Sequence, residues 1–187
     1  MRDITGKKIL IVASNGFEQS ELEVPRDRLR AAGATVDIAS PEKGEIRGWE
    51  HKDWGRPVKV DVGLGDIRAA DYDAIVLPGG QMNPDTLRGN RQAVDLVRAF
   101  YDQGKVVAAV CHAPWLLIEA GIAGGLKATS FKTVKTDLIN AGADWRDEKV
   151  VVDNGVITSR NPGDLEAFSE KIAEEVAEGR HLDRKAA

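Results

Sequence analysis

Four short apolar runs, separated by longer amphipathic segments, constrain the fold more than any other feature of this sequence. The runs cover residues 9–13, 35–39, 74–77 and 106–110. Their apolar residues stand next to one another instead of alternating with polar ones, which is typical of strands buried on both faces. The amphipathic segments between them predict covering helices. We therefore expect an α/β fold: a three-layer α/β/α sandwich around a mainly parallel sheet.

Glycine and proline residues mark where the helices begin and end. Ala-Gly pairs at Gly33, Gly121 and Gly142 should close three helices, since glycine adopts the left-handed conformation at low cost. Pro25 should occupy a first turn or mark a kink. Three helices are predicted at 18–32, 90–104 and 112–121. A fourth includes residues 138–139 and ends at 142, and a fifth begins at the Asn161–Pro162 cap.

No linker or low-complexity segment interrupts the chain. We therefore expect a single domain over residues 1–187, with its core at about 7–178. Residues 44–57 are the one irregular insertion and are expected to form a hairpin or a loop. The tail after Gly179 is expected to fray.

The composition excludes several classes of protein. Of the 187 residues, 42% are hydrophobic and 30% charged, a balance typical of globular and not of disordered proteins. The net charge of −4 offers no basic surface for nucleic acid or an anionic membrane. The apolar runs are too short to span a bilayer, and no export signal is visible. We expect a cytoplasmic protein.

The chain has one cysteine and three histidines. A single cysteine cannot form an internal disulfide, and a structural zinc site, which needs four such ligands, is not expected. Gly63-Leu64-Gly65 lacks both the third glycine and the preceding strand of a dinucleotide-binding loop. We therefore expect no cofactor and no metal.

Polar and small residues follow three of the predicted strands. The first segment is 14–18 and ends in Glu18. The second is the glycine pair Gly79–Gly80, and the third is Cys111–His112. Ligands of open parallel sheets bind beyond the carboxyl ends of the strands. We expect these three loops to share one crevice.

Cys111 is the main candidate for a catalytic residue. It ends an apolar strand just before a predicted helix, which is the position of a nucleophile elbow. A helix N-terminus can also lower the pKa of a thiol. The alternative is a small buried hydrophobic residue. His112 follows directly, and a sharp turn would let its imidazole take the thiol proton; otherwise it caps the helix or contacts a neighbouring subunit.

Three further residues are candidates for assisting the thiol. The N–H groups of Gly79 and Gly80, with the amide of His112, could bind negative charge developing on an oxygen, although the glycines could equally form an ordinary turn. Glu18 could be held protonated and donate a hydrogen bond to a thiolate. Taken alone, it is better explained as a first-turn glutamate favoured by the helix dipole.

Four motifs resemble the PfpI intracellular protease family, within the superfamily of the Parkinson-associated protein deglycase. They are Ala-Ser-Asn-Gly-Phe-Glu at 13–18, Leu-Pro-Gly-Gly at 77–80, Ala-Val-Cys-His-Ala-Pro at 109–114 and Thr-Ser-Arg-Asn-Pro-Gly-Asp at 158–164. The resemblance runs from Lys7 to about Val176. It implies a flavodoxin-like sandwich in which Cys111 is the nucleophile, Glu18 the protonated carboxyl group, and Gly80 and His112 the amides of the oxyanion site.

The resemblance also implies subunit contacts. In this branch of the family, the histidine is completed by an acid from a neighbouring subunit, and the matching position here is Asp85. The protein is therefore expected to be a homodimer or a larger homo-oligomer. Arg160 lies in the 158–164 motif, which in relatives lies near the pocket, where its arginine can bind anions. Trp115 departs from the family pattern, and the insertion's Trp49, His51 and Trp54 would cover the site or pack against a partner.

Three functions fit these residues. The first is hydrolysis of reactive carbonyls, in which the cysteine attacks methylglyoxal or its adducts on proteins and water releases lactate without a cofactor. The second is an intracellular cysteine peptidase that uses Cys111, His112 and Asp85. The third is a stress protein without turnover, whose thiol is oxidised as a sensor or which acts as a chaperone. We favour the first as the working hypothesis.

Overall fold

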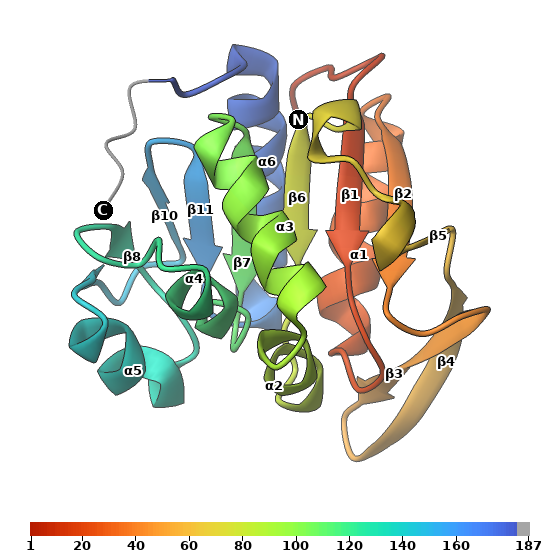
Figure 1. Cartoon of the computed structure of the whole chain (residues 1–187), viewed down its shortest axis with the longest axis horizontal. Coiled ribbons are helices and arrows are strands. Elements are labelled where there is room, and N and C mark those ends of the chain that lie inside the picture. The colour runs from red at the N-terminus through yellow and green to blue at the C-terminus, as the bar shows by residue number, and fades with distance from the viewer. Residues whose placement is uncertain (183–187) are drawn as a thin grey trace.

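The computed structural model of the chain describes residues 1–182, and its centre is a seven-stranded sheet in the order β10-β11-β7-β6-β1-β2-β5 (Figure 1). All neighbouring strands are parallel except β10 and β11. The strands are β1 (Lys8–Val12), β2 (Thr35–Ser40), β5 (Val62–Gly63), β6 (Ala74–Leu77), β7 (Val106–Val110), β10 (Val150–Asp153) and β11 (Val156–Ser159).

Helices cover both faces of this sheet. They are α1 (Gln19–Ala31), α2 (Met82–Arg88), α3 (Arg91–Asp102), α4 (Trp115–Glu119), α5 (Lys135–Asn140) and α6 (Leu165–Glu178). Helices α1 and α6 pack together on one face, and α3 lies on the other face with α2 and α4 against it and α5 next to α4 (Figure 1). The expected α/β/α sandwich is confirmed.

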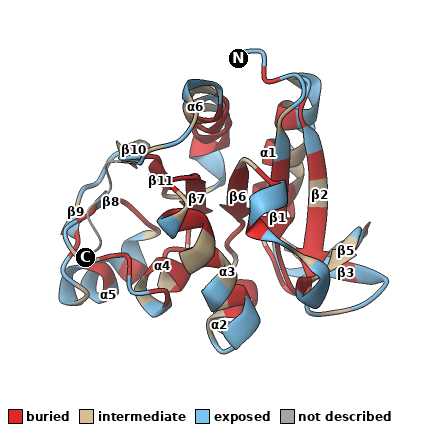
Figure 2. Ribbon diagram, turned by 45° about the horizontal axis from the view of Figure 1, so that its top comes forward, coloured by how far each residue is buried: buried red, intermediate tan, exposed pale blue. Residues whose placement is uncertain are grey.

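Alternate side chains of the central strands enter two separate cores. In β1, Ile9 and Ile11 pack with α1 and α6, whereas Leu10 and Val12 pack with α3. All four are essentially inaccessible to solvent, and Figure 2 shows the same for the neighbouring central strands. A strand covered on both faces needs apolar residues at every position, which explains the unbroken apolar runs.

Two small sheets lie outside the main one. The insertion forms an antiparallel hairpin of β3 (Glu45–Glu50) and β4 (Asp53–Lys59), as one of the two expected alternatives. Strands β8 (Lys127–Ala128) and β9 (Asp144–Trp145) form a short parallel pair. The β10–β11 hairpin is not among the predicted elements, although its turn, Asn154–Gly155, has positive φ at both residues and Asn-Gly is a strong hairpin signal.

The ends of the helices follow the sequence closely. Gly33, Gly121 and Gly142 all have positive φ, as the predicted C-caps require. Pro25 lies in the middle of α1, so the expectation of a first-turn proline is wrong. Beyond Gly179 the chain folds back, and the N–H of His181 donates to the carbonyl of Gly104 at 2.7 Å. The rest of the predicted frayed tail, 183–187, lies outside the described residues.

Strands β1, β6 and β7 are adjacent and parallel, so they end at one edge of the sheet. The loops that follow them meet there, and the N–H of Glu18 donates to the carbonyl of Gly79 at 3.3 Å. This edge is where the sequence analysis placed the candidate site. No helix within residues 1–182 has the length and apolar character needed to cross a bilayer.

Candidate active site

Cys111 lies at a sharp turn directly after β7. Its φ is +64°, in the left-handed region that costs a non-glycine residue about 1–3 kcal/mol. Its N–H donates to the carbonyl of Ser159 at 3.0 Å, and its own carbonyl accepts from the N–H of Phe131 at 2.8 Å. The surrounding chain therefore holds the backbone in this strained conformation, and the elbow geometry that the sequence predicts is present.

The carboxyl group beside the thiol belongs to Glu21, in the first turn of α1. Glu21 is 0% exposed, and its Oε2 accepts the N–H of Gly79 at 2.9 Å. It lies close enough to the Cys111 thiol for each group to shift the pKa of the other. Burial, and then the charge of Glu18, raise the pKa of Glu21 to about 8. Glu21 is therefore protonated at neutral pH, and its Oε1 has no hydrogen-bond partner among residues 1–182.

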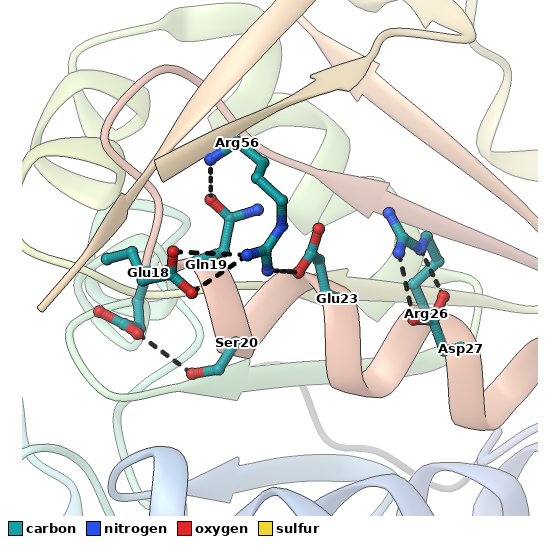
Figure 3. Close-up of polar contacts among 8 residues, drawn as sticks. Glu18, Gln19, Ser20, Glu23, Arg26, Asp27 and Arg56 are labelled. Atoms are coloured by element: carbon teal, nitrogen blue, oxygen red, sulfur yellow. Dashed lines mark hydrogen bonds and ion pairs between the residues drawn. The ribbon is translucent and has the colours of Figure 1, made fainter. Parts of the chain in front are cut away.

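Glu18 does not have the role that the family resemblance implied for it. It is half-buried and accepts a hydrogen bond from the Ser20 hydroxyl at 3.1 Å (Figure 3). The reason is local: Glu18 is the N-cap residue, with an extended backbone, and its side chain does not lie on the inner face of α1. Glu21 lies four residues before Pro25 and eight before Leu29, and all three are on the buried face of α1. This helical spacing could have identified Glu21 as the buried carboxyl group.

Burial raises the pKa of the Cys111 thiol, and a charged Glu21 would raise it further. The amides of Gly80 and His112 oppose this effect without cancelling it. The expected lowering by a helix dipole is wrong, because residues 111–114 form a turn and α4 begins only at Trp115. With Cys111 only 6% exposed, the thiolate must be formed by passing its proton to a neighbouring base.

His112 is placed to be that base. Its Nδ1 lies 3.1 Å from the sulfur of Cys111, so the turn brings the adjacent side chains together. The ring stacks on Phe131, with centroids 4.9 Å apart at 23°, and meets the edge of Trp115 at 5.2 Å. Burial lowers the pKa of His112, which keeps the imidazole neutral at pH 7 and able to accept a proton.

The two glycines after β6 have different roles. The N–H of Gly79 donates to Glu21, so it is not available to an oxyanion. A Cβ at Gly79 would lie 2.5 Å from Glu21 Oε2 and 2.6 Å from Cys111 Cβ, so only glycine fits. The N–H groups of Gly80 and His112 face the sulfur and are the amides positioned to stabilise negative charge there.

Asp85 and Arg160 do not meet this cluster within the chain. Asp85 is exposed on α2, and its carboxylate has no hydrogen bond or ion pair within residues 1–182. Arg160 donates to Asp164 at 2.9 Å and to Asp147 at 2.7 Å, so two carboxylates balance its charge. It lines a cavity of about 200 Å³ that Phe131 also borders.

Trp115 contacts the catalytic histidine candidate, whereas Trp49 and Trp54 belong to the β3–β4 hairpin. Trp115 donates from Nε1 to Asp137 at 2.8 Å and holds the edge of His112. Trp49 and Trp54 pack edge-to-face on the β3–β4 hairpin, where Trp54 is 42% exposed, and His51 lies at the hairpin turn.

The start of α1 fixes the hairpin in place. Gln19 Oε1 accepts the backbone N–H of Arg56 at 2.9 Å, and the Arg56 guanidinium pairs with Glu23 and Glu50 (Figure 3). No group of three or more His, Cys, Asp or Glu side chains within residues 1–182 is arranged to hold a metal ion.

Comparisons with known proteins show which proteins this chain is similar to. The model of the DJ-1/PfpI family matches residues 7–175. Deglycase PfpI of Pyrococcus furiosus is 45% identical over 161 residues, which cover 86% of this chain and 94% of that protein. General stress protein 18 of Bacillus subtilis is 39% identical over 166 residues, covering 88% and 94%. The crystal structure of Drosophila melanogaster DJ-1beta has a TM-score of 0.84 at 32% identity, covering 94% of this chain and 93% of that chain.

Proposed function

Because the chain belongs to the DJ-1/PfpI family, we propose that it is a stress-protective, cysteine-dependent hydrolase of reactive carbonyls such as methylglyoxal, or of their adducts on proteins. It acts in the cytoplasm as a homo-oligomer. The observation that carries the proposal is the position of the Cys111 sulfur, between the protonated carboxyl group of Glu21 and the neutral Nδ1 of His112. The name of the deglycase relative supports this reaction class, and the name of the stress-protein relative supports the protective role.

The reaction proceeds on these residues without a cofactor. His112 Nδ1 takes the thiol proton, Glu21 donates a hydrogen bond to the sulfur, and the sulfur attacks the aldehyde carbon. The amides of Gly80 and His112 stabilise the resulting alkoxide, which is then protonated to a hemithioacetal. A base moves the proton of the former aldehyde carbon to the ketone carbon, and the hemithioacetal hydroxyl passes its proton to the ketone oxygen, giving a lactoyl thioester. Water cleaves that thioester, releasing lactate and the thiol.

Lactate formation from methylglyoxal tests the proposal. Cys111 is the only cysteine in the chain, so iodoacetamide blocks one defined thiol. We expect the untreated protein to form lactate and the alkylated protein to form none, measured with a lactate assay. Equal lactate from both samples, or none from the untreated protein, would contradict the proposal. If peroxide then added two oxygens to Cys111 in a protein without turnover, a redox sensor would be the better description.

The contact of 3.1 Å between Cys111 Sγ and His112 Nδ1 also favours a second function, a cysteine peptidase. That function requires an acid at the imidazole, which we propose to be Asp85 of a neighbouring subunit. We expect Asp85→Asn to lower cleavage of a fluorogenic peptide at least about tenfold, because the histidine loses its orienting carboxylate. Asp66→Asn, at another exposed aspartate, is the matched control. Undiminished cleavage by Asp85→Asn would remove the triad from consideration.

A further inference from the structure

The two ring nitrogens of His112 face different partners from different parts of the chain. Nδ1 faces the sulfur of Cys111 at 3.1 Å, and Nε2 lies 3.3 Å from the hydroxyl oxygen of Thr133. The faces and edges of the ring are held by Phe131 and Trp115. The imidazole of His112 therefore lies between the thiol of Cys111 and the hydroxyl group of Thr133.

The fold sets the position of Thr133 through the elbow itself. Thr133 lies in the short 3-10 turn η3 (Lys132–Val134). Phe131, two residues before Thr133, donates its N–H to the carbonyl of Cys111 at 2.8 Å, and the following residue, Val134, is fully buried. The segment that carries Thr133 is thus held in place before it and after it. Before it, the contact is a hydrogen bond to the backbone of Cys111, and after it, the contact is the buried side chain of Val134.

We propose that Thr133 is the positioning residue for His112, taking within one chain the part that a carboxylate plays in a Ser-His-Asp triad. Thr133 Oγ1 accepts the Nε2–H of the neutral ring, which leaves the lone pair of Nδ1 facing the thiol. When the thiol proton moves to Nδ1, the imidazolium keeps its hydrogen bond to Thr133. The inference rests on the proposed function, since it assigns His112 as the base.

The charged groups near the ring have other partners. Asp137 accepts from Trp115 Nε1 at 2.8 Å, and the guanidinium of Arg88 lies over the Trp115 ring while it pairs with Glu119. No carboxylate within residues 1–182 hydrogen-bonds His112. Thr133 is thus the one group with a hydrogen bond to Nε2 in the described part of the chain.

The test compares Thr133→Val, which removes the hydroxyl and keeps the side-chain shape, with Thr133→Ser, which restores it. Thr136→Val, at an exposed threonine on α5, is the matched control. Nitrogen-15 NMR of the imidazole, assigned by its loss in His112→Gln, reports the tautomer directly. We expect the Nε2–H tautomer in the wild type, Thr133→Ser and Thr136→Val, and a mixture of tautomers in Thr133→Val.

Two rates provide the second readout. In Thr133→Val we expect alkylation of Cys111 by iodoacetamide at pH 7, and kcat for lactate formation, to fall about tenfold with KM unchanged, since one hydrogen bond to the base is lost. Thr133→Ser should recover both rates. An unchanged tautomer and unchanged alkylation of Cys111 in Thr133→Val would overturn the inference. If the wild type makes no lactate but Thr133→Val still changes the tautomer and alkylation, the proposed function fails and the inference stands.

Discussion

Replacing Cys111 by serine is expected to lower the rate of lactate formation by at least about 10³-fold, because a serine hydroxyl is a far weaker nucleophile than the thiol at this site. His112 can accept a proton from the thiol, but the alcohol holds its proton much more strongly. Glu21 is protonated at neutral pH and cannot act as a second base. The measurement is kcat/KM for methylglyoxal at pH 7 in both proteins.

The substitution should leave the fold intact. Serine is close to isosteric with cysteine, and the strained φ of +64° is the same for both side chains. We expect the free energy of unfolding to change by less than about 2 kcal/mol. A serine variant that keeps its activity within tenfold of the wild type would show that the sulfur is not the attacking atom.

Replacing Glu21 by glutamine is expected to abolish a large pH dependence of stability. The pKa of Glu21 is about 8 in the folded chain against an ordinary value of 4.5, so the folded protein keeps a proton that the unfolded chain releases. This contribution is fully present below pH 4.5 and is lost as the pH rises toward 8, at about 1.4 kcal/mol per pH unit. Glutamine, which does not titrate, has no such loss.

Urea unfolding at pH 5 and pH 8 measures the effect. Between these values the wild type should lose about 3.5 kcal/mol more than Glu21→Gln, which is a large share of the stability of an ordinary domain. Glu45→Gln, at an exposed glutamate, is the matched control and should follow the wild type. Parallel pH profiles for the wild type and Glu21→Gln would mean that Glu21 is ionised in the folded protein.

The fold could be predicted where several consecutive residues are all apolar. Runs such as 106–110 are apolar at each position because helices cover both faces of β7. The glycines at the ends of helices have positive φ, as their positions in the sequence predicted. The strands at the sheet edges were harder to predict. Strands β5, β8 and β9 each have only two residues, too few for a periodic pattern, and the β10–β11 hairpin was missed despite its Asn-Gly turn.

The candidate site was predictable only in part. The elbow at Cys111 and its contact with His112 follow from a local strand-to-turn pattern, so the sequence was sufficient for them. The choice between Glu18 and Glu21 depends on which face of α1 turns toward the glycine pair, and the motif gave the wrong glutamate. The hydroxyl of Thr133 had no signal at all in the sequence, since a threonine between Lys132 and Val134 in a polar segment resembles many others.

The sequence by itself determined the layered sheet, the strained turn and the identity of the sole thiol, because these depend on residues that are neighbours along the chain. Only the tertiary structure decided which carboxyl group holds a proton beside the sulfur, that burial raises rather than lowers the pKa of that sulfur, and which side chain meets the far nitrogen of the histidine. Each of these depends on solvent exclusion and on contacts between segments distant in the chain, and neither is encoded in a local pattern.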